Sequence, residues 1–148
     1  MLTSLFQSTA DPGSGDFSQE ELSDLAGKLA KDLRAPAARY LRSARMFLAW
    51  MESTQDQLES RFRVPGGSAV NSDGMYYWRL DTADYVERYG IELPADFIER
   101  ARAVKWTPPT IDDVRFLEIY GELEHLMRSF SRGNENPLTT FYPTPDHH

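Results

Sequence analysis

The sequence predicts a mainly α fold, a single-domain bundle of about five helices with a short β-hairpin or extended loop near residues 65–80. Apolar residues recur at helical spacing through most of the chain, and residues that favour helix N-termini precede several of these stretches. A cluster rich in Pro, Gly, Ser and Asn interrupts this pattern at residues 64–74. The chain has 148 residues, of which 41% are hydrophobic, and this length suits one domain with a core.

The chain divides into three parts, which we expect to be a flexible tail, a single helical domain and a second flexible tail, at residues 1–16, 17–133 and 134–148. Ser18 and Glu21 have the spacing of a capping box and should begin a first helix over residues 19–34. Pro36 suits the first turn of a second, central helix over residues 36–61. The apolar face of that helix would comprise Tyr40, Ala44, Phe47, Met51, Leu58 and Phe62.

Residues 68–71 and 75–78 are expected to pair as a small hairpin across Ser72, Asp73 and Gly74. Successive side chains of a strand point to opposite faces, so one set should enter the core and the other should face outward. The core set would be Tyr76, Trp78 and Leu80, and the outward set would be Met75, Tyr77 and Arg79.

Three further helices complete the prediction. Asp81 has the position of an N-cap for a short helix, and Gly90 suits the left-handed residue at its end. Thr110 is placed to cap the last long helix, with two aspartates in the first turn. We expect these helices at residues 82–89, 94–104 and 111–132.

The net charge of -7 is distributed unevenly along the chain. Residues 34–63 carry six arginines against three acids, a balance of +3, whereas residues 81–124 carry eleven acids against five bases, a balance of -6. A domain that binds duplex nucleic acid normally has the opposite overall sign, so nucleic acid is an unlikely partner. An acidic surface instead favours a basic protein as the partner.

The residue types restrict the available chemistry. The sequence contains no cysteine, which excludes disulfides, thiolate zinc sites and cysteine nucleophiles. His125 is the only histidine in the predicted domain, and it lies on a helix between acids. The paired carboxylates Asp81/Asp84 and Asp112/Asp113 occupy first turns of predicted helices, where capping and the helix dipole account for them. We therefore expect no catalytic residue, cofactor or metal.

The favoured function is that of a non-enzymatic, acidic protein-binding module. Bacterial immunity proteins and antitoxins, which neutralise a basic toxin by covering it, belong to this class. The sequence shows neither a secretory signal nor a stretch of about 18 apolar residues, so we expect a cytoplasmic protein with no membrane contact. The partner would contact exposed anchors and acids on the hairpin and the following helix, namely Tyr77, Arg79, Asp84, Glu87 and Arg88.

Two alternatives remain open at this stage. The first is a small-molecule site or an enzyme, with Asp81 or Glu87 as the acid and a pocket beside Trp78, Tyr85 and Trp106. The second is anion or nucleic-acid binding by a row of arginines at every third position, Arg39, Arg42 and Arg45. Long arginine stems also cover apolar surface and pair with acids, which is the structural explanation of the same row.

Overall fold

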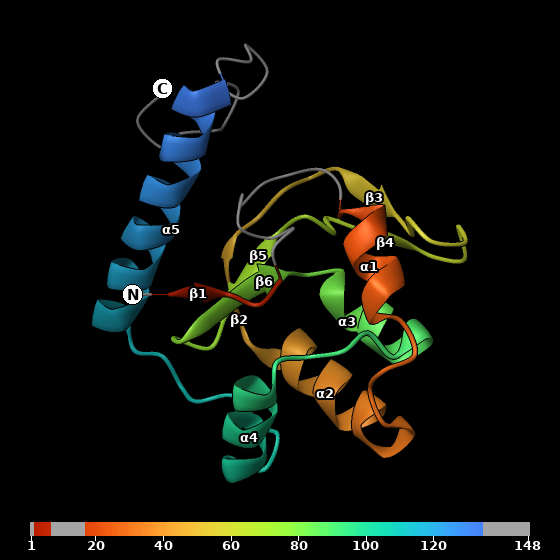
Figure 1. Ribbon diagram of the computed structural model, residues 1–148. Helices are drawn as coiled ribbons and strands as arrows, with labels where there is room; N and C mark the ends of the chain where they lie inside the picture. The colour runs from red at the N-terminus through yellow and green to blue at the C-terminus, as the bar shows by residue number, and fades with distance from the viewer. Residues whose placement is uncertain (1, 7–16, 135–148) are drawn as a thin grey trace.

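The protein is a mixed α/β domain, which corrects the predicted mainly α, all-helical fold. Within residues 2–6 and 17–134, the parts of the chain that the computed structural model describes, five helices accompany a four-stranded mixed sheet and a two-stranded sheet (Figure 1). Side chains are described to residue 128. The predicted C-terminal tail lies outside the described residues, except for its first residue, which ends the last helix.

The helices are α1 (Gln19–Leu25), α2 (Lys31–Ser43), α3 (Thr82–Tyr89), α4 (Ala95–Ala103) and α5 (Asp113–Asn134). The strands are β1 (Thr3–Ser4), β2 (Arg45–Leu48), β3 (Ser53–Gln55), β4 (Arg63–Pro65), β5 (Val70–Ser72) and β6 (Tyr76–Arg79). The main sheet has the order β1-β6-β5-β2; β1 runs parallel to β6, and the other pairs are antiparallel. Strands β3 and β4 form a separate antiparallel ribbon.

The predicted long helix over residues 36–61 is wrong, and this error accounts for the incorrect fold class. Helix α2 ends at Ser43, whose hydroxyl donates to the carbonyl oxygens of Arg39 and Tyr40 at 2.7 and 3.2 Å. The next residue, Ala44, has an extended backbone, and β2 then pairs with β5. The apolar residues at helical spacing in this stretch therefore belong partly to helix α2 and partly to strand β2. Pairing of β2 with β5 determines the structure of the second part, although its local spacing is that of a helix.

The predicted first helix is also divided. Ser18 caps α1 as expected, since its hydroxyl accepts the N–H of Glu21 at 3.3 Å. The helix nevertheless stops at Leu25, and Gly27 adopts a left-handed backbone with φ 79°. Glycine adopts this conformation without a steric penalty, so the chain turns here before α2 begins.

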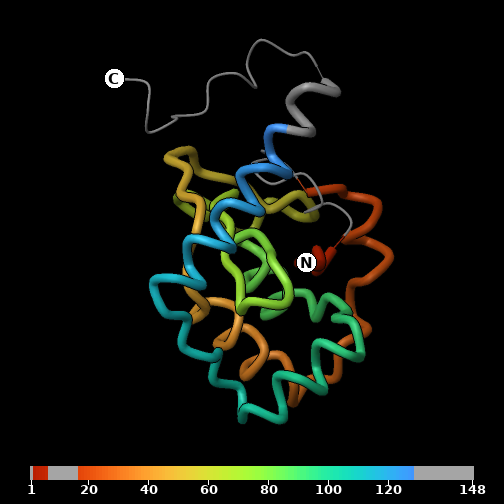
Figure 2. The backbone as a smooth tube through the Cα atoms, turned by 90° about the vertical axis from the view of Figure 1, so that its left-hand side faces the viewer, coloured from red at the N-terminus to blue at the C-terminus, as the bar shows by residue number. Residues whose placement is uncertain are grey.

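The predicted hairpin is present as β5 and β6, with Asn71 opposite Trp78. Its two faces contribute to two separate apolar clusters. On one face, Trp78 packs with residues of α1, α2, α3 and α4; on the other, Tyr77 packs with Ile119 and Leu123 of α5. Figures 1 and 2 show α5 crossing the sheet on the side opposite the other helices. Tyr77 and Arg79 are buried, so the expectation that they would face outward is wrong, whereas Met75 is exposed as expected.

Residues 2–6 join the sheet, although a flexible tail was expected over residues 1–16; the rest of that predicted tail lies outside the described residues. The N–H groups of Thr3 and Leu5 donate to the carbonyl oxygens of Met75 and Tyr77 at 2.9 and 3.0 Å. The side chains of this segment at positions 2, 5 and 6 are at most 6% exposed. Burial of these three large apolar side chains fixes this short strand against β6.

Candidate protein-binding groove

The interface predicted from the sequence is not assembled in the structure. Tyr77 and Arg79 are buried, at 4% and 2% exposure, so neither is a surface anchor. Asp84 and Glu87 do lie together on the outer side of α3, where Nη2 of Arg42 contacts their carboxylate oxygens at 3.3 and 2.9 Å. These two acids are thus already paired with a cation of α2.

Arg88, the fifth predicted partner residue, is exposed. Its guanidinium lies 5.7 Å from the centre of the Phe62 ring, which is a cation–π contact within the domain. The arginine is therefore engaged with the β3–β4 side of the molecule, and the predicted set divides between the core and separate surface contacts.

Arg79 instead forms a buried ion pair with Asp81. Its Nε and Nη2 atoms contact the two carboxylate oxygens at 3.1 and 2.7 Å, and its guanidinium lies 4.4 Å from the Phe17 ring centre. The Thr54 hydroxyl donates to the same carboxylate at 2.7 Å. Asp81 is consequently not the side-chain N-cap that the sequence predicted. A Cβ atom at Gly67 would lie 1.8 Å from Oγ1 of Thr54, so this approach requires glycine.

The pocket predicted beside Trp78, Tyr85 and Trp106 is filled by packing. Trp78 and Tyr85 are 0% and 1% exposed, and the tyrosine hydroxyl accepts the N–H of Gln57 at 2.8 Å. Burial raises the pKa of Tyr85 well above its usual value. Trp106 lies edge-on to Tyr40, with ring centres 6.4 Å apart. These aromatic residues are therefore part of the core and its margin.

The arginine row is largely used within the domain. Arg42 bridges two acids of α3, as described above. Arg45 donates to the carbonyl oxygen of Ile111 at 2.8 Å and lies 4.2 Å from the ring centre of Phe116. Arg39 is exposed. Arg42 is thus paired with acids, and Arg45 covers an aromatic ring, as the structural explanation of the row expected.

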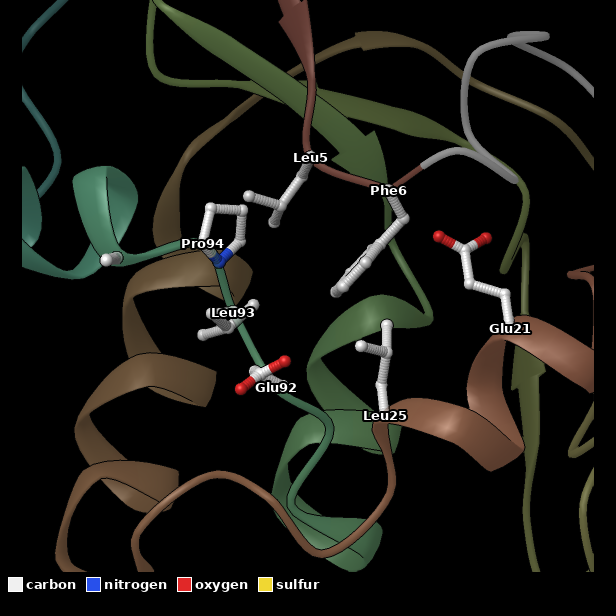
Figure 3. Close-up of a pocket in the computed structure, with 8 residues that line it drawn as sticks. Leu5, Phe6, Glu21, Leu25, Glu92, Leu93 and Pro94 are labelled. Carbon is white, nitrogen blue, oxygen red and sulfur yellow. The ribbon is translucent and has the colours of Figure 1, made fainter.

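A groove of ≈ 470 Å³ lies between the end of β1, helix α1 and the segment that leads into α4 (Figure 3). Volumes of about 300–1,000 Å³ are typical of ligand sites in proteins. The lining consists of apolar side chains and two carboxylates, from Leu5, Phe6, Leu25, Leu93, Pro94 and Ala95 together with Glu21 and Glu92. The site is not evident from the sequence, because three segments that are distant in the chain form it.

Backbone hydrogen bonds fix the walls of the groove. The N–H of Leu5 is bonded to β6, and the N–H of Glu92 donates to the carbonyl oxygen of Leu25 at 2.9 Å. Nearby, Gly27 and Leu29 donate to the carbonyl oxygens of Tyr89 and Gly90 at 2.7 and 3.0 Å. The segments after α1 and after α3 are therefore joined directly, and the groove is a formed feature of the fold.

The charge of the groove is purely acidic. Among the described residues that line it, Glu21 and Glu92 are the only charged ones, and α1 carries Glu20, Glu21 and Asp24 without a basic residue. Among the residues that the structure describes, no ion pair involves Glu92, which is exposed. A carboxylate beside apolar groups attracts a cation more strongly than one surrounded by water. The groove can thus hold an apolar group next to a cationic one.

Two buried carboxylates serve the fold rather than an open site. Asp73 accepts the Tyr40 hydroxyl at 2.6 Å and the N–H groups of Met75 and Tyr76 at 3.0 and 2.9 Å, which ties the hairpin turn to α2. Burial, followed by the bond to Asp73, raises the pKa of Tyr40. The carboxylate side chain of Asp73 is fully buried. These contacts position the hairpin.

Asp56 has the corresponding role in the loop between β3 and β4. Its carboxylate accepts the Tyr89 hydroxyl and the N–H groups of Leu58 and Arg61, the latter two at 2.8 and 2.9 Å. Burial alone would raise the pKa of Asp56, but these hydrogen bonds lower it below the usual value. This ionised carboxylate therefore attaches the loop to α3, in addition to the bond between Gln57 and the Tyr85 hydroxyl.

Comparison with known proteins adds no relative from which a function could be transferred. No family model, curated protein or solved structure matched the chain. Among the described residues, no group of three or more metal-ligating side chains is placed to hold an ion, and no helix has the length and apolar character needed to cross a membrane. Function is therefore inferred from the groove and from the distribution of charge.

Proposed function

We propose that this chain is a non-enzymatic protein-binding module that docks a basic partner protein at its acidic groove. The observation that carries the proposal is that, among the described residues lining the groove, the two charged ones are acids, above an apolar floor. A role like that of immunity proteins or antitoxins, which neutralise a basic protein by covering it, fits this arrangement. We propose a cytoplasmic location, since a chain without cysteine requires no oxidising compartment.

In the proposed binding, long-range electrostatic attraction and short-range apolar contact have different roles. A net charge of -7 attracts a basic partner from a distance and raises the association rate, an effect that salt screens over about 8–10 Å. The apolar floor then provides contact area at short range and slows dissociation. An acidic surface alone would give fast but weak association.

The test is affinity capture with the intact chain from cells of the native host, followed by binding kinetics against each captured protein. The groove variant Glu21→Lys/Glu92→Lys is compared with Glu59→Lys/Glu118→Lys, which makes the same change in net charge at two exposed positions away from the groove. We expect a basic protein whose affinity falls at least about tenfold with the groove variant, a difference near 1.4 kcal/mol. Capture of no basic protein, or equal losses in the two variants, would contradict the proposal.

A further inference from the structure

We infer that the groove receives a short basic–apolar–basic segment of the partner, in which one large apolar side chain is flanked by Lys or Arg. This inference rests on the proposed function and specifies the chemistry of the recognised segment. It follows from the floor of the groove, from the positions of its two carboxylates, and from the way in which the groove continues along α4.

The floor of the groove is apolar and held rigidly by the core. Leu5, Phe6 and Leu93 line it, yet each is at most 5% exposed, because most of its surface packs inward. Phe6 also lies edge-on to Phe17, with ring centres 6.2 Å apart. A preformed floor loses little conformational entropy when a side chain packs on it, so a single apolar anchor gains most of its contact energy.

The two carboxylates lie on different walls. Glu21 belongs to α1, and Glu92 belongs to the segment that leads into α4. Figure 3 shows the side chains of Phe6 and Leu25 between them. An apolar side chain seated on these two residues would therefore have a carboxylate on either side, which is the arrangement that two flanking cations complement. The same carboxylates disfavour an acidic segment, because like charges repel.

The groove continues beyond its own walls, which favours a polypeptide over a small cation. Ala95 lines both this groove and a neighbouring hollow of ≈ 330 Å³ on α4, whose other lining residues are Ile98, Glu99 and Arg102. A partner segment that extends past Ala95 thus reaches a second concave surface, which carries one acid, Glu99, and one base, Arg102. A free organic cation would use only the first hollow.

The experiment is an NMR titration of the full-length, ¹⁵N-labelled chain with blocked synthetic pentapeptides at millimolar concentration. The probe is Ser-Arg-Leu-Arg-Ser, and the matched peptides are Ser-Glu-Leu-Glu-Ser and Ser-Arg-Ser-Arg-Ser. We expect the probe to shift the amide signals of Glu21, Leu25 and Glu92, and we expect each matched peptide to bind at least about tenfold more weakly. Butylguanidinium, a small organic cation, is titrated in parallel to test whether a cation without a peptide chain binds the groove as well as the probe.

Variants locate the contact without disturbing the core. Glu92→Gln keeps the shape of an exposed side chain and should weaken the probe about fivefold, whereas Glu59→Gln, distant from the groove, should leave it unchanged. The inference is overturned if the acidic peptide binds equally well, if the shifts centre elsewhere, if no shift occurs, or if butylguanidinium binds as tightly as the probe.

The two proposals fail in distinguishable ways. If a basic protein is captured through the groove but the probe peptide does not bind, only the inference about the segment is wrong. If the probe binds as expected but no basic protein is captured, the chemistry of the groove stands and the proposed function is wrong.

Discussion

Among single residues, the buried charges determine how the hairpin and its neighbours are held. Arg79 and Asp81 form a two-pronged ion pair inside the domain, and both side chains are at most 2% exposed. The cost of removing two charges from water is offset only while both partners and their hydrogen bonds are present. Thr54 supplies an additional hydrogen bond to the carboxylate.

We expect Asp81→Ala to lower the free energy of unfolding by about 3–5 kcal/mol, because it leaves the Arg79 guanidinium buried without its carboxylate. Urea denaturation followed by tryptophan fluorescence measures this loss. Glu59→Ala, which breaks an exposed pair with Arg61, should cost about 0–1 kcal/mol and serves as the control. The double variant Arg79→Met/Asp81→Leu should lose less than Asp81→Ala; an equal or larger loss would show that the pair is not a self-contained unit.

The Asp56 network predicts a dependence of stability on pH. The folded-state pKa of Asp56 lies below the ordinary value of 3.8, so ionisation adds stability that is complete well above pH 3.8 and disappears as the pH falls through the folded-state pKa. The difference in free energy of unfolding between the parent and Asp56→Asn should therefore be largest near neutral pH and shrink at acid pH. Denaturation curves between pH 7 and pH 2.5 measure it, and a difference independent of pH would contradict the assignment.

The hydroxyl of Tyr89 predicts a second dependence of stability on pH, in the alkaline range. Burial, together with the hydrogen bond to Asp56, raises the pKa of Tyr89 to about 12. A neutral hydroxyl with a raised pKa adds stability that is present below about pH 10 and is lost as the pH rises through the folded-state value. Tyr89→Phe should remove the part of the alkaline dependence that Tyr89 contributes, while the buried Tyr40 and Tyr85 retain theirs. Tyrosinate absorbance and denaturation at high pH measure the difference from the parent.

Single residues were predictable from the sequence where their role is local. The Ser18 cap and the left-handed Gly90 depend on a few neighbouring residues and appear as expected. Tyr77 and Arg79 were expected at the surface, because strand alternation identifies two faces without showing that α5 covers the second. Asp81 was expected as a cap, but its carboxylate pairs with Arg79 and accepts the hydroxyl of Thr54, a residue distant in the sequence.

Among the elements, β1 depends most on distant contacts. It contains only two residues in the ladder, but its segment buries three large apolar side chains and also joins the N–H of Leu2 to the carboxylate of Glu122 on α5 at 2.6 Å. No local periodicity can reveal a strand this short. Its partner strand lies more than half the domain away in the sequence, which is why the segment resembled a tail.

Deletion of residues 1–6 should destabilise the domain, because these residues are not the flexible tail that the sequence predicted. Full burial of a large apolar side chain contributes about 1.5–3 kcal/mol, so the loss of three should lower the free energy of unfolding by roughly 5 kcal/mol or more. Thermal and urea denaturation measure the change, and Thr3→Ala, at an exposed position, is the control. A deletion variant as stable as the parent would show that β1 is not part of the cooperative core.

Helix α5 is attached to the sheet through stacked aromatic rings. Phe47 of β2 is 6% exposed and lies 4.7 Å from Phe116, measured between ring centres. Phe47→Ala should cost about 3–5 kcal/mol, although the residue lies on a strand and not on the predicted central helix. A double-mutant cycle with Phe116→Ala should give a coupling of about 0.5–1.5 kcal/mol, and additive losses would argue against the stacking.

At the scale of the whole molecule, the β5–β6 hairpin joins two apolar clusters on opposite faces of one sheet. Trp78 belongs to the cluster formed with α1–α4, and Val70 and Tyr77 belong to the cluster formed with α5. The sequence predicted the hairpin and its turn correctly. It could not show that helices cover both faces, because a mainly α interpretation had assigned β2, the strand that extends the sheet, to a helix.

This shared hairpin predicts that the domain unfolds in one step. Loss of either cluster exposes one face of the hairpin and removes support from the other, so the two should melt together. The urea midpoints measured by far-UV circular dichroism and by tryptophan fluorescence should coincide. Two separated midpoints would show that α5 and the rest of the domain unfold independently.

The pairing of β1 with β6 has a consequence for the order in which the protein is made. Residues 2–6 leave the ribosome well before residues 75–77, to which they are hydrogen-bonded in the finished sheet. During that interval Leu2, Leu5 and Phe6 lack their partners and present apolar surface to chaperones that hold nascent chains. Since Leu5 and Phe6 also line the groove, the groove forms only after most of the domain has been synthesised.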